Sequence, residues 1–162
     1  RSEAGGVNIR RIMPEQTRAL RASVLRAGRP ASEAAYACDA DVRTVHFGAF
    51  EGPDAEPFAV ATMHADRRGD VPWRLRGMAT QPDRRGNGAG RALVAACAEH
   101  ASAVGVADSG SIWCNARVTA QRFYERCGFV VDSAVFDLPP IGAHCVMVMR
   151  PPVAGTEADR RG

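Results

Sequence analysis

The residues best suited to chemistry lie in a glycine-rich stretch, RRGNGAG, at residues 84–90. An apolar helical pattern follows it over residues 93–104. Glycines leave backbone N–H groups unshielded at a helix start, where unpaired donors and the positive end of the helix dipole favour an anion. The dipole alone is worth only ~0.3–1 kcal/mol when exposed. Several convergent amides and the flanking arginines are therefore needed to hold a pyrophosphate group.

Two common phosphate-binding patterns do not match this stretch. A Walker loop needs a lysine after its last glycine, but the chain contains no lysine and all 21 basic residues are arginine. A dinucleotide fingerprint needs G-x-G-x-x-G with an acidic residue further on, whereas these glycines are spaced G-x-G-x-G. The pattern that fits is R-x-x-G-x-G, filled by Arg85, Gly88 and Gly90.

The strands and helices that must position this loop can be predicted from the alternation of apolar and polar residues, from helical spacing and from Gly and Pro residues that end an element. Pro82 separates a strand from the loop, and Gly28 ends a first helix that starts near Pro14. Residues 31–41 are ambiguous, with a short helix at 34–38 as one alternative, and residues 66–71 are expected to be a polar connection. The expected strands are 7–12, 42–50, 56–64, 73–80, 111–116, 130–136 and 145–149, and the other helices are 90–104 and 119–127. This order predicts a mixed sheet with helices on both faces.

Size and composition set the class of protein. A chain of 162 residues with 46% apolar and 24% charged residues forms one ordinary globular domain. A net charge of +3 with scattered arginines does not predict a nucleic-acid surface. The five cysteines lack a C-x-x-C pair and predict free thiols. No apolar run has the length of a membrane span, so we expect a cytoplasmic protein without membrane or nucleic-acid partners.

Three stretches together resemble the GNAT superfamily of N-acetyltransferases, in a bacterial branch. Arg85–Gly90 resembles its acyl-CoA pyrophosphate loop, and Leu75–Thr80 resembles its splayed fourth strand. Asn115 and the run F-Y-x-x-x-G-F at residues 123–129 resemble its second CoA-side motif, and residues 136–144 resemble its ending. The resemblance implies an α/β (α+β) fold with a mixed, mostly antiparallel sheet of six to seven strands. The domain is expected to span residues 7–150, since the polar stretches at 1–6 and 151–162 predict a disordered start and a mobile tail.

The resemblance implies acetyl-CoA as co-substrate. Main-chain groups of Met78, Ala79 and Thr80 would hydrogen-bond the pantetheine like an added strand, and the Met78 N–H would polarise the thioester carbonyl. The implied cofactor contacts are Met78, Ala79, Thr80, Arg84, Arg85, Gly86, Asn87, Gly88, Ala89, Gly90, Arg91, Asn115 and Tyr124. The alternatives are a plain tight turn for the glycines and an ordinary strand-end cap for Asn115.

Tyr124 is the residue we expect to take part in catalysis, since many GNAT enzymes carry an acid at this position. A phenol with a pKa near ~10 keeps its proton at neutral pH and can protonate a departing thiolate. Such help is typically worth ~10²–10⁴ in rate. The alternative is a core aromatic on an amphipathic helix, but we expect Phe123 to fill that role.

The expected activity is acetyl-CoA-dependent N-acetylation, in which the primary amine of a small molecule or peptide attacks directly, without a metal. The alternative is a non-catalytic CoA-binding sensor on the same fold. The general base stays open, because residues 73–80 contain no carboxylate. Its candidates are His46, His64, Glu51, Asp66 and His144, of which His144 and His46 are taken as acceptor-side residues. The arginines at 21, 26 and 29 either bind an acidic acceptor or, as the default, face solvent, and edge strands near the C-terminus suggest a homodimer.

Overall fold

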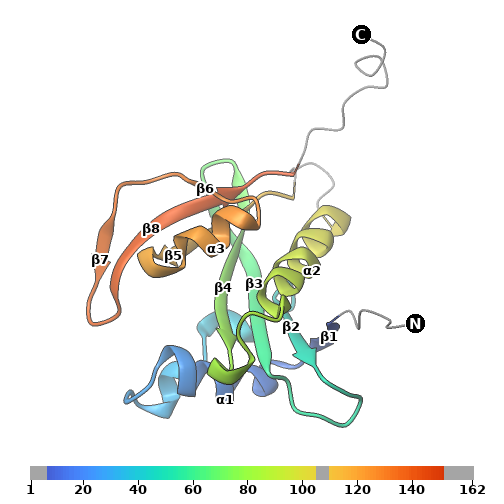
Figure 1. The fold of residues 1–162 in the computed structure, drawn as a ribbon. Helices are drawn as coiled ribbons and strands as arrows, with labels where there is room; N and C mark the ends of the chain where they lie inside the picture. Colours follow the sequence, from blue (N-terminus) through green and yellow to red (C-terminus); the bar gives the residue numbers. More distant parts are fainter. Residues whose placement is uncertain (1–6, 105–109, 152–162) are drawn as a thin grey trace.

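The computed structural model describes residues 7–104 and 110–151. The expectations for residues 1–6 and 152–162 lie outside this range. The strands are β1 (Asn8–Ile12), β2 (Val45–Phe50), β3 (Ala59–Arg68), β4 (Val71–Thr80), β5 (Ile112–Arg117), β6 (Val130–Val131), β7 (Phe136–Leu138) and β8 (Gly142–Met149). The helices are α1 (Arg18–Leu20), α2 (Ala89–Val104) and α3 (Gln121–Arg126), and the short helical turns are η1 (Pro14–Thr17), η2 (Arg21–Leu25), η3 (Ala31–Ala34), η4 (Ala37–Ala40), η5 (Pro82–Arg84) and η6 (Val118–Ala120). Figure 1 shows their arrangement.

The strands form one sheet in the order β1-β2-β3-β4-β5-β8-β6, with β7 also paired to β8. Only β4 and β5 run parallel; the other pairs are antiparallel. This confirms the mixed, mostly antiparallel sheet, but eight strands exceed the expected six to seven. The expected strand at 130–136 is divided because the Ser133 hydroxyl accepts the Val146 N–H at 2.8 Å, in place of a backbone partner.

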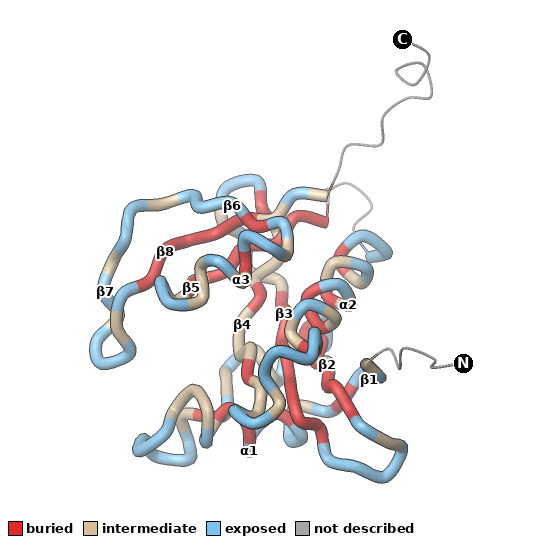
Figure 2. Tube along the Cα trace, in the orientation of Figure 1, coloured by how far each residue is buried: buried red, intermediate tan, exposed pale blue. Residues whose placement is uncertain are grey.

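Helices cover both faces of the sheet, as expected. Residues 59–64 of β3 are buried on both faces (Figure 2), as a central strand between two layers should be. Ala61 belongs to the larger core cluster, together with Leu93 of α2. The next residue, Val60, belongs to a second cluster with Leu20 of α1. Because neighbouring side chains of a strand point to opposite faces, α1 and α2 lie on opposite sides of β3.

One local expectation was wrong, and the structure resolves a second stretch that the sequence left open. The stretch 66–71 is not a polar connection, because β3 and β4 extend into it and meet at a turn with Gly69 at φ 59°. Residues 31–41 form two short 3-10 turns, η3 and η4, instead of one helix at 34–38. The first helical segment does run from Pro14 to Leu25, but it changes from a 3-10 turn through one α-turn to a π-turn at η2.

The parallel pair at the centre of the sheet separates soon after it forms. β4 and β5 pair only at Trp73 with Ile112 and at Arg74 with Trp113. β4 then continues to Thr80 along β3, while β5 follows β8. Figure 1 shows β7 and β8 curving away from the lower part of β3 and β4. One edge of β4 is therefore free of β5 beyond Arg74.

Candidate active site

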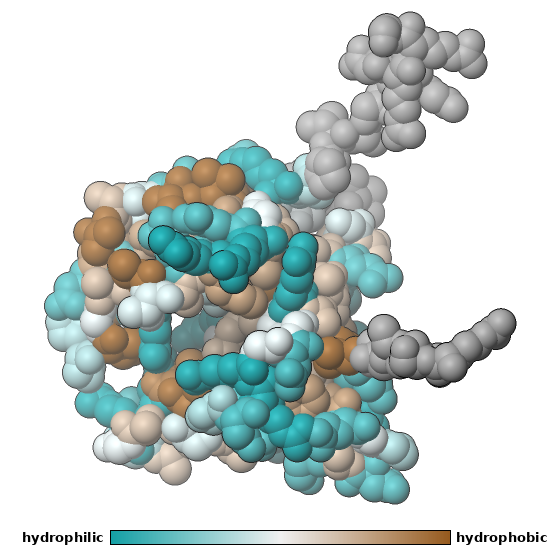
Figure 3. All heavy atoms as spheres, viewed as in Figure 1, coloured by the Kyte–Doolittle hydropathy of each residue, from teal (hydrophilic) through white to brown (hydrophobic). Residues whose placement is uncertain are grey.

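A cavity of about 860 Å³ lies where β4 and β5 separate. Its walls come from β4, the glycine-rich loop, the start of α2, the end of β5, α3, the end of η2 and the β7–β8 hairpin. Figure 3 shows this face hollowed, with hydrophilic side chains along much of the rim. The cavity thus brings together the three stretches that the sequence singles out.

The glycine-rich loop has the geometry that an anion site requires. Gly86 and Gly88 have φ of 86° and 79°, which disfavours any other residue, and an added Cβ at either would meet nothing within 4 Å. Gly90 is needed for a different reason, because its added Cβ would lie 2.9 Å from the Phe123 ring. The Ala92 N–H donates to the Gly88 carbonyl at 3.0 Å, which starts α2 and leaves the three preceding N–H groups without a helical acceptor.

The arginines around the loop differ in whether they already pair with a carboxylate. Arg84 forms an ion pair with Glu51 and lies over the Phe58 ring. Arg85 and Arg91 are exposed and line the cavity. Asn87 is exposed at the loop and is not among the lining residues. Two arginines are therefore directly available to an anion, and a third is held by a carboxylate.

A β-bulge shapes the wall that β4 contributes. The register slips by one residue between Val60 and Thr62 of β3, so that one β3 residue faces both Gly77 and Met78. Gly77 has φ 64°, and its added Cβ would lie 3.1 Å from the Tyr36 ring. A bulge bends a strand and re-aims its groups. This one lies at the residue whose N–H is expected to contact the thioester oxygen.

Tyr124 lines the cavity from α3, and Asn115 lines it from β5. The Tyr124 ring makes edge-to-face contacts with Phe123 at 5.1 Å and Phe129 at 5.4 Å between centroids. Tyr124 is 8% exposed and belongs to the core, whereas Phe123 is only half-buried, so the expectation that Phe123 takes the core role was wrong. Burial, together with the nearby Cys114 and Cys127, raises the pKa of Tyr124 above its ordinary value. The phenol therefore keeps its proton throughout the neutral range.

Of the five candidate bases, the structure brings only His144 to the cavity. Its Nδ1 lies 2.7 Å from the Gly142 carbonyl oxygen, and its ring stacks on Phe136. A neutral ring that donates from Nδ1 leaves Nε2 as a proton acceptor. The remaining candidates are engaged or buried elsewhere: Glu51 pairs with Arg84, Asp66 with Arg74, and His46 and His64 are buried outside the cavity.

The comparisons with known proteins agree with this arrangement. Residues 40–131 match the model of a family described as acetyltransferase (GNAT) domain. An uncharacterized N-acetyltransferase of Bacillus subtilis, YitI, is 31% identical over 147 residues, which cover 87% of this chain and 94% of that protein. The chain belongs to the GNAT acetyltransferase family.

Solved structures show how widely this GNAT fold is shared. A candidate N-acetyltransferase of Lactobacillus plantarum has a TM-score of 0.74 at 24% identity, over 90% of this chain and 99% of that one. An aminoglycoside 6'-N-acetyltransferase complexed with coenzyme A has a TM-score of 0.62 at 15% identity, over 88% of this chain and 96% of that one. At these identities the likeness concerns the fold alone.

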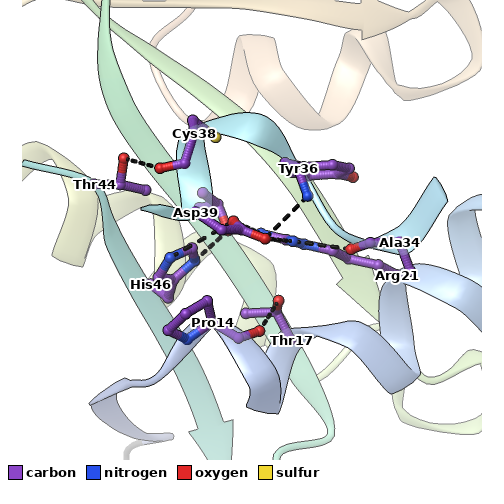
Figure 4. A network of polar contacts seen from close by, with 10 residues as sticks. Pro14, Thr17, Arg21, Ala34, Tyr36, Cys38, Asp39, Thr44 and His46 are labelled. Atoms are coloured by element: carbon purple, nitrogen blue, oxygen red, sulfur yellow. Dashed lines mark hydrogen bonds and ion pairs between the residues drawn. The ribbon is translucent and has the colours of Figure 1, made fainter. Parts of the chain in front are cut away.

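The GNAT domain also contains a buried polar network that sequence reasoning missed. The default of a solvated face for Arg21 was wrong, because this residue is 0% exposed. Its guanidinium donates to both Asp39 carboxylate oxygens at 2.8 and 3.0 Å and to the Thr62 hydroxyl at 2.7 Å (Figure 4). His46 Nδ1 lies 2.8 Å from the same hydroxyl, which places His46 in this network and away from the cavity. The one feature of the sequence that indicates burial of Arg21 is its position on the helix, next to Leu20 on the apolar face.

The network supports one wall of the cavity. The Arg21 guanidinium lies 3.8 Å from the centroid of the Tyr36 ring, and Arg76 lies 4.1 Å from the same centroid. Burial alone would raise the pKa of Asp39, but hydrogen bonds from Arg21 and the Tyr36 N–H outweigh it and hold that pKa below its ordinary value. The pair is therefore charged at neutral pH and holds Tyr36 beside the bulge at Gly77.

Three further observations concern metal ligands, thiols and membrane-spanning helices. Among the residues that the structure describes, no group of three or more His, Cys, Asp or Glu side chains could hold a metal ion. The five cysteines are free thiols, and burial raises the pKa of Cys97 and Cys114 to about 12. In residues 7–104 and 110–151, no helix is long and apolar enough to cross a membrane.

Proposed function

We propose that this protein is an N-acetyltransferase that moves the acetyl group of acetyl-CoA to a primary amine by direct attack. The observation that carries this proposal is a single cavity lined by the glycine loop, the free edge of β4, Asn115 and Tyr124. Acetyl-CoA would supply the activated acetyl group as a thioester. The loop donors of residues 86–91, with Arg85 and Arg91, would hold its pyrophosphate.

The free edge of β4 positions the reacting thioester. Met78, Ala79 and Thr80 lie beyond the last residue of β4 that pairs with β5, so their main-chain groups can pair with the pantetheine amides like an added strand. Met78 follows the bulge at Gly77 and lines the cavity, and its N–H would stabilise the negative charge that develops on the carbonyl oxygen. Asn115 faces this edge from β5 and contacts the pantetheine or the acyl group.

In the reaction, the amine nitrogen forms a bond to the carbonyl carbon and the carbon–sulfur bond breaks. Tyr124 donates a hydrogen bond to the departing sulfur. Because burial raises the pKa of Tyr124 further above that of a thiol, ~8.5, a free phenolate is unfavourable, and the phenol gives its proton to the sulfur only as it receives another. That proton is the one the amine loses, passed on through His144 and solvent, so that CoA leaves as a thiol and the phenol ends protonated.

The cavity also favours loss of the amine proton. Its described lining residues include eight arginines and no aspartate or glutamate. A nearby positive charge disfavours a protonated amine and so lowers its pKa. His144 Nε2 is the group in the cavity best placed to accept the proton that the nitrogen releases after attack.

The test is Tyr124→Phe, which removes the hydroxyl and keeps the two edge-to-face ring contacts. We expect kcat to fall by ~10²–10⁴, with acetyl-CoA affinity by calorimetry changed less than about twofold. Unchanged steady-state kinetics would remove Tyr124 from the mechanism. If the native protein bound acetyl-CoA but released no thiol with any amine, it would be a non-catalytic CoA-binding domain.

A further inference from the structure

A second cavity of about 750 Å³ adjoins the first at the end away from the glycine loop. It is bounded by the end of η2, Glu33, Tyr36 and the Pro139–Ile141 loop, and it contains no residue of 84–91. Arg26, Arg76 and Arg117 line both cavities. The second cavity therefore offers the acceptor an entrance of its own. The three arginines lie where the two cavities meet, which we call the junction.

None of these three guanidinium groups forms an ion pair in the described part of the chain, although the charge of Arg26 helps to lower the pKa of Glu33. Arg26 and Arg117 both donate to a single oxygen, the Leu25 carbonyl, at 3.1 and 3.3 Å, so their guanidinium groups lie close together. Arg76 stacks on Tyr36, and no ion pair of Arg76 occurs in the described part of the chain. Burial, and then the charge of Arg74, lower the pKa of Arg76 from its ordinary value.

The nearby carboxylates are already used. Glu33 is the acidic residue of the second cavity, and it pairs with Arg29 at 2.9 Å. Asp66 pairs with Arg74 at 3.3 Å, at the other side of the junction. The arginines that line the phosphate side, at 84, 85, 91 and 126, have the phosphates of coenzyme A to bind. Those phosphates are separated from the junction by the pantetheine arm, so the three junction arginines need another anion.

We propose that the acceptor is a small amine that carries a carboxylate, bound by Arg76, Arg117 and Arg26 with its nitrogen toward the thioester. This rests on the proposed acetyl transfer. Arginine stays charged in proteins, so the guanidinium groups of Arg26 and Arg117, which share one carbonyl oxygen, repel each other until an anion joins them, and Arg76 lines the same two cavities. The planar guanidinium fork matches a carboxylate in two parallel hydrogen bonds. The same positive charge repels polyamines and other cationic acceptors.

The first experiment uses the native protein with acetyl-CoA and matched pairs of amines, each an amino acid and its carboxamide. Thiol release is measured for each. We expect kcat/KM to be ~10–100-fold higher for the acid, because a hydrogen-bonded charge contributes more than a neutral group. If carboxamides react as well as the acids, the carboxylate proposal is wrong although acetyl transfer stands. If no amine reacts, acetyl transfer itself fails.

The second experiment tests whether the junction arginines cause the preference for the acid over the carboxamide. Arg117→Gln and Arg76→Gln should reduce the acid-over-carboxamide ratio by at least ~10-fold, mainly through KM. CoA affinity by calorimetry should stay unchanged. Arg122→Gln, on the exposed side of α3 and outside both cavities, is the matched control and should keep the ratio. A preference that survives both junction substitutions would overturn the assignment.

Discussion

The two ends of the active-site cavity are built in different ways. The phosphate end comes mainly from one continuous stretch, residues 84–91, whose glycines leave backbone N–H groups open to the cavity. The acceptor end consists of side chains from segments far apart in the sequence, including Arg26, Tyr36, Arg76, Arg117 and Ile141. Backbone donors at a helix start can be recognised from local sequence. An assembly of distant side chains depends on the whole fold, so the two ends differ in what supports them.

Charge also distinguishes the two ends. At the phosphate end, Glu51 offsets Arg84. At the acceptor end Glu33 pairs with Arg29, and a second carboxylate, Asp39, lies behind the wall and is bound to the buried Arg21. The phosphate end therefore depends on local backbone geometry, whereas the acceptor end depends on a buried ion pair. Four predictions follow from this contrast.

The largest effect is expected from Arg21→Leu, which leaves Asp39 buried without its partner. Breaking a buried pair by removing one member is typically worth 3–5 kcal/mol, so we expect the free energy of unfolding to fall by ~3–5 kcal/mol in urea titrations. The control is Asp70→Asn, which breaks the exposed pair with Arg150 at 2.7 Å and should leave the free energy of unfolding essentially unchanged. Equal effects of both substitutions would show that the acceptor wall does not depend on the Arg21 network.

The same contrast explains what the sequence could predict. The loop at 84–90 and the Tyr124 motif are consecutive residues with a chemical meaning of their own, and the structure places both on one cavity. Arg21 could not be predicted, because its partners Asp39 and Thr62 lie 18 and 41 residues away. The relative burial of Phe123 and Tyr124 was also predicted wrongly. On a short helix, one residue of offset decides which ring faces the core, and only tertiary packing sets that offset.

The next largest effect is the loss of unfolding free energy at acid pH, through a histidine on β3 close to the Arg21 network. Burial, followed by the charges of Arg76 and Arg74, lowers the pKa of His64 to about 4. The unfolded chain takes up a proton near pH ~6.5. The contribution of His64 is therefore fully present above pH 6.5 and is lost as the pH falls toward 4.

We expect the native protein to lose ~2–3 kcal/mol of unfolding free energy between pH 6.5 and 4 through His64. His64→Gln should flatten this part of the profile, measured by urea titration at half-unit steps. Burial also lowers the pKa of His46, so the unfolding free energy of His64→Gln should still fall with pH, but less steeply. A profile of unchanged steepness in His64→Gln would assign the acid sensitivity to other groups.

A smaller effect, on CoA binding, tests whether backbone N–H groups of the glycine loop hold the phosphates. Gly88→Ala places a Cβ at φ 79° in the loop, which strains the backbone by ~1–2 kcal/mol and displaces the N–H donors. We expect CoA affinity to fall by ~10-fold or more in calorimetry. Gly69→Ala is a matched control, since Gly69 has φ 59° and open space around an added Cβ at the β3–β4 turn. It should lower the melting temperature similarly and leave CoA affinity unchanged; a loss of affinity in both variants would point to general destabilisation.

The smallest effect is expected at Glu51, whose carboxylate holds Arg84. The Arg84 side chain is 34% exposed and that of Glu51 is 55% exposed, so the pair is weak and its arginine can be released. Glu51→Gln should therefore raise CoA affinity by ~2–5-fold at low salt, because a freed guanidinium can reach a phosphate and a nearby negative charge is gone. The gain should shrink as ionic strength rises, which a calorimetric series in NaCl would measure. If affinity instead falls, Glu51 positions Arg84 for the phosphate, and this end of the cavity also depends on a side-chain pair.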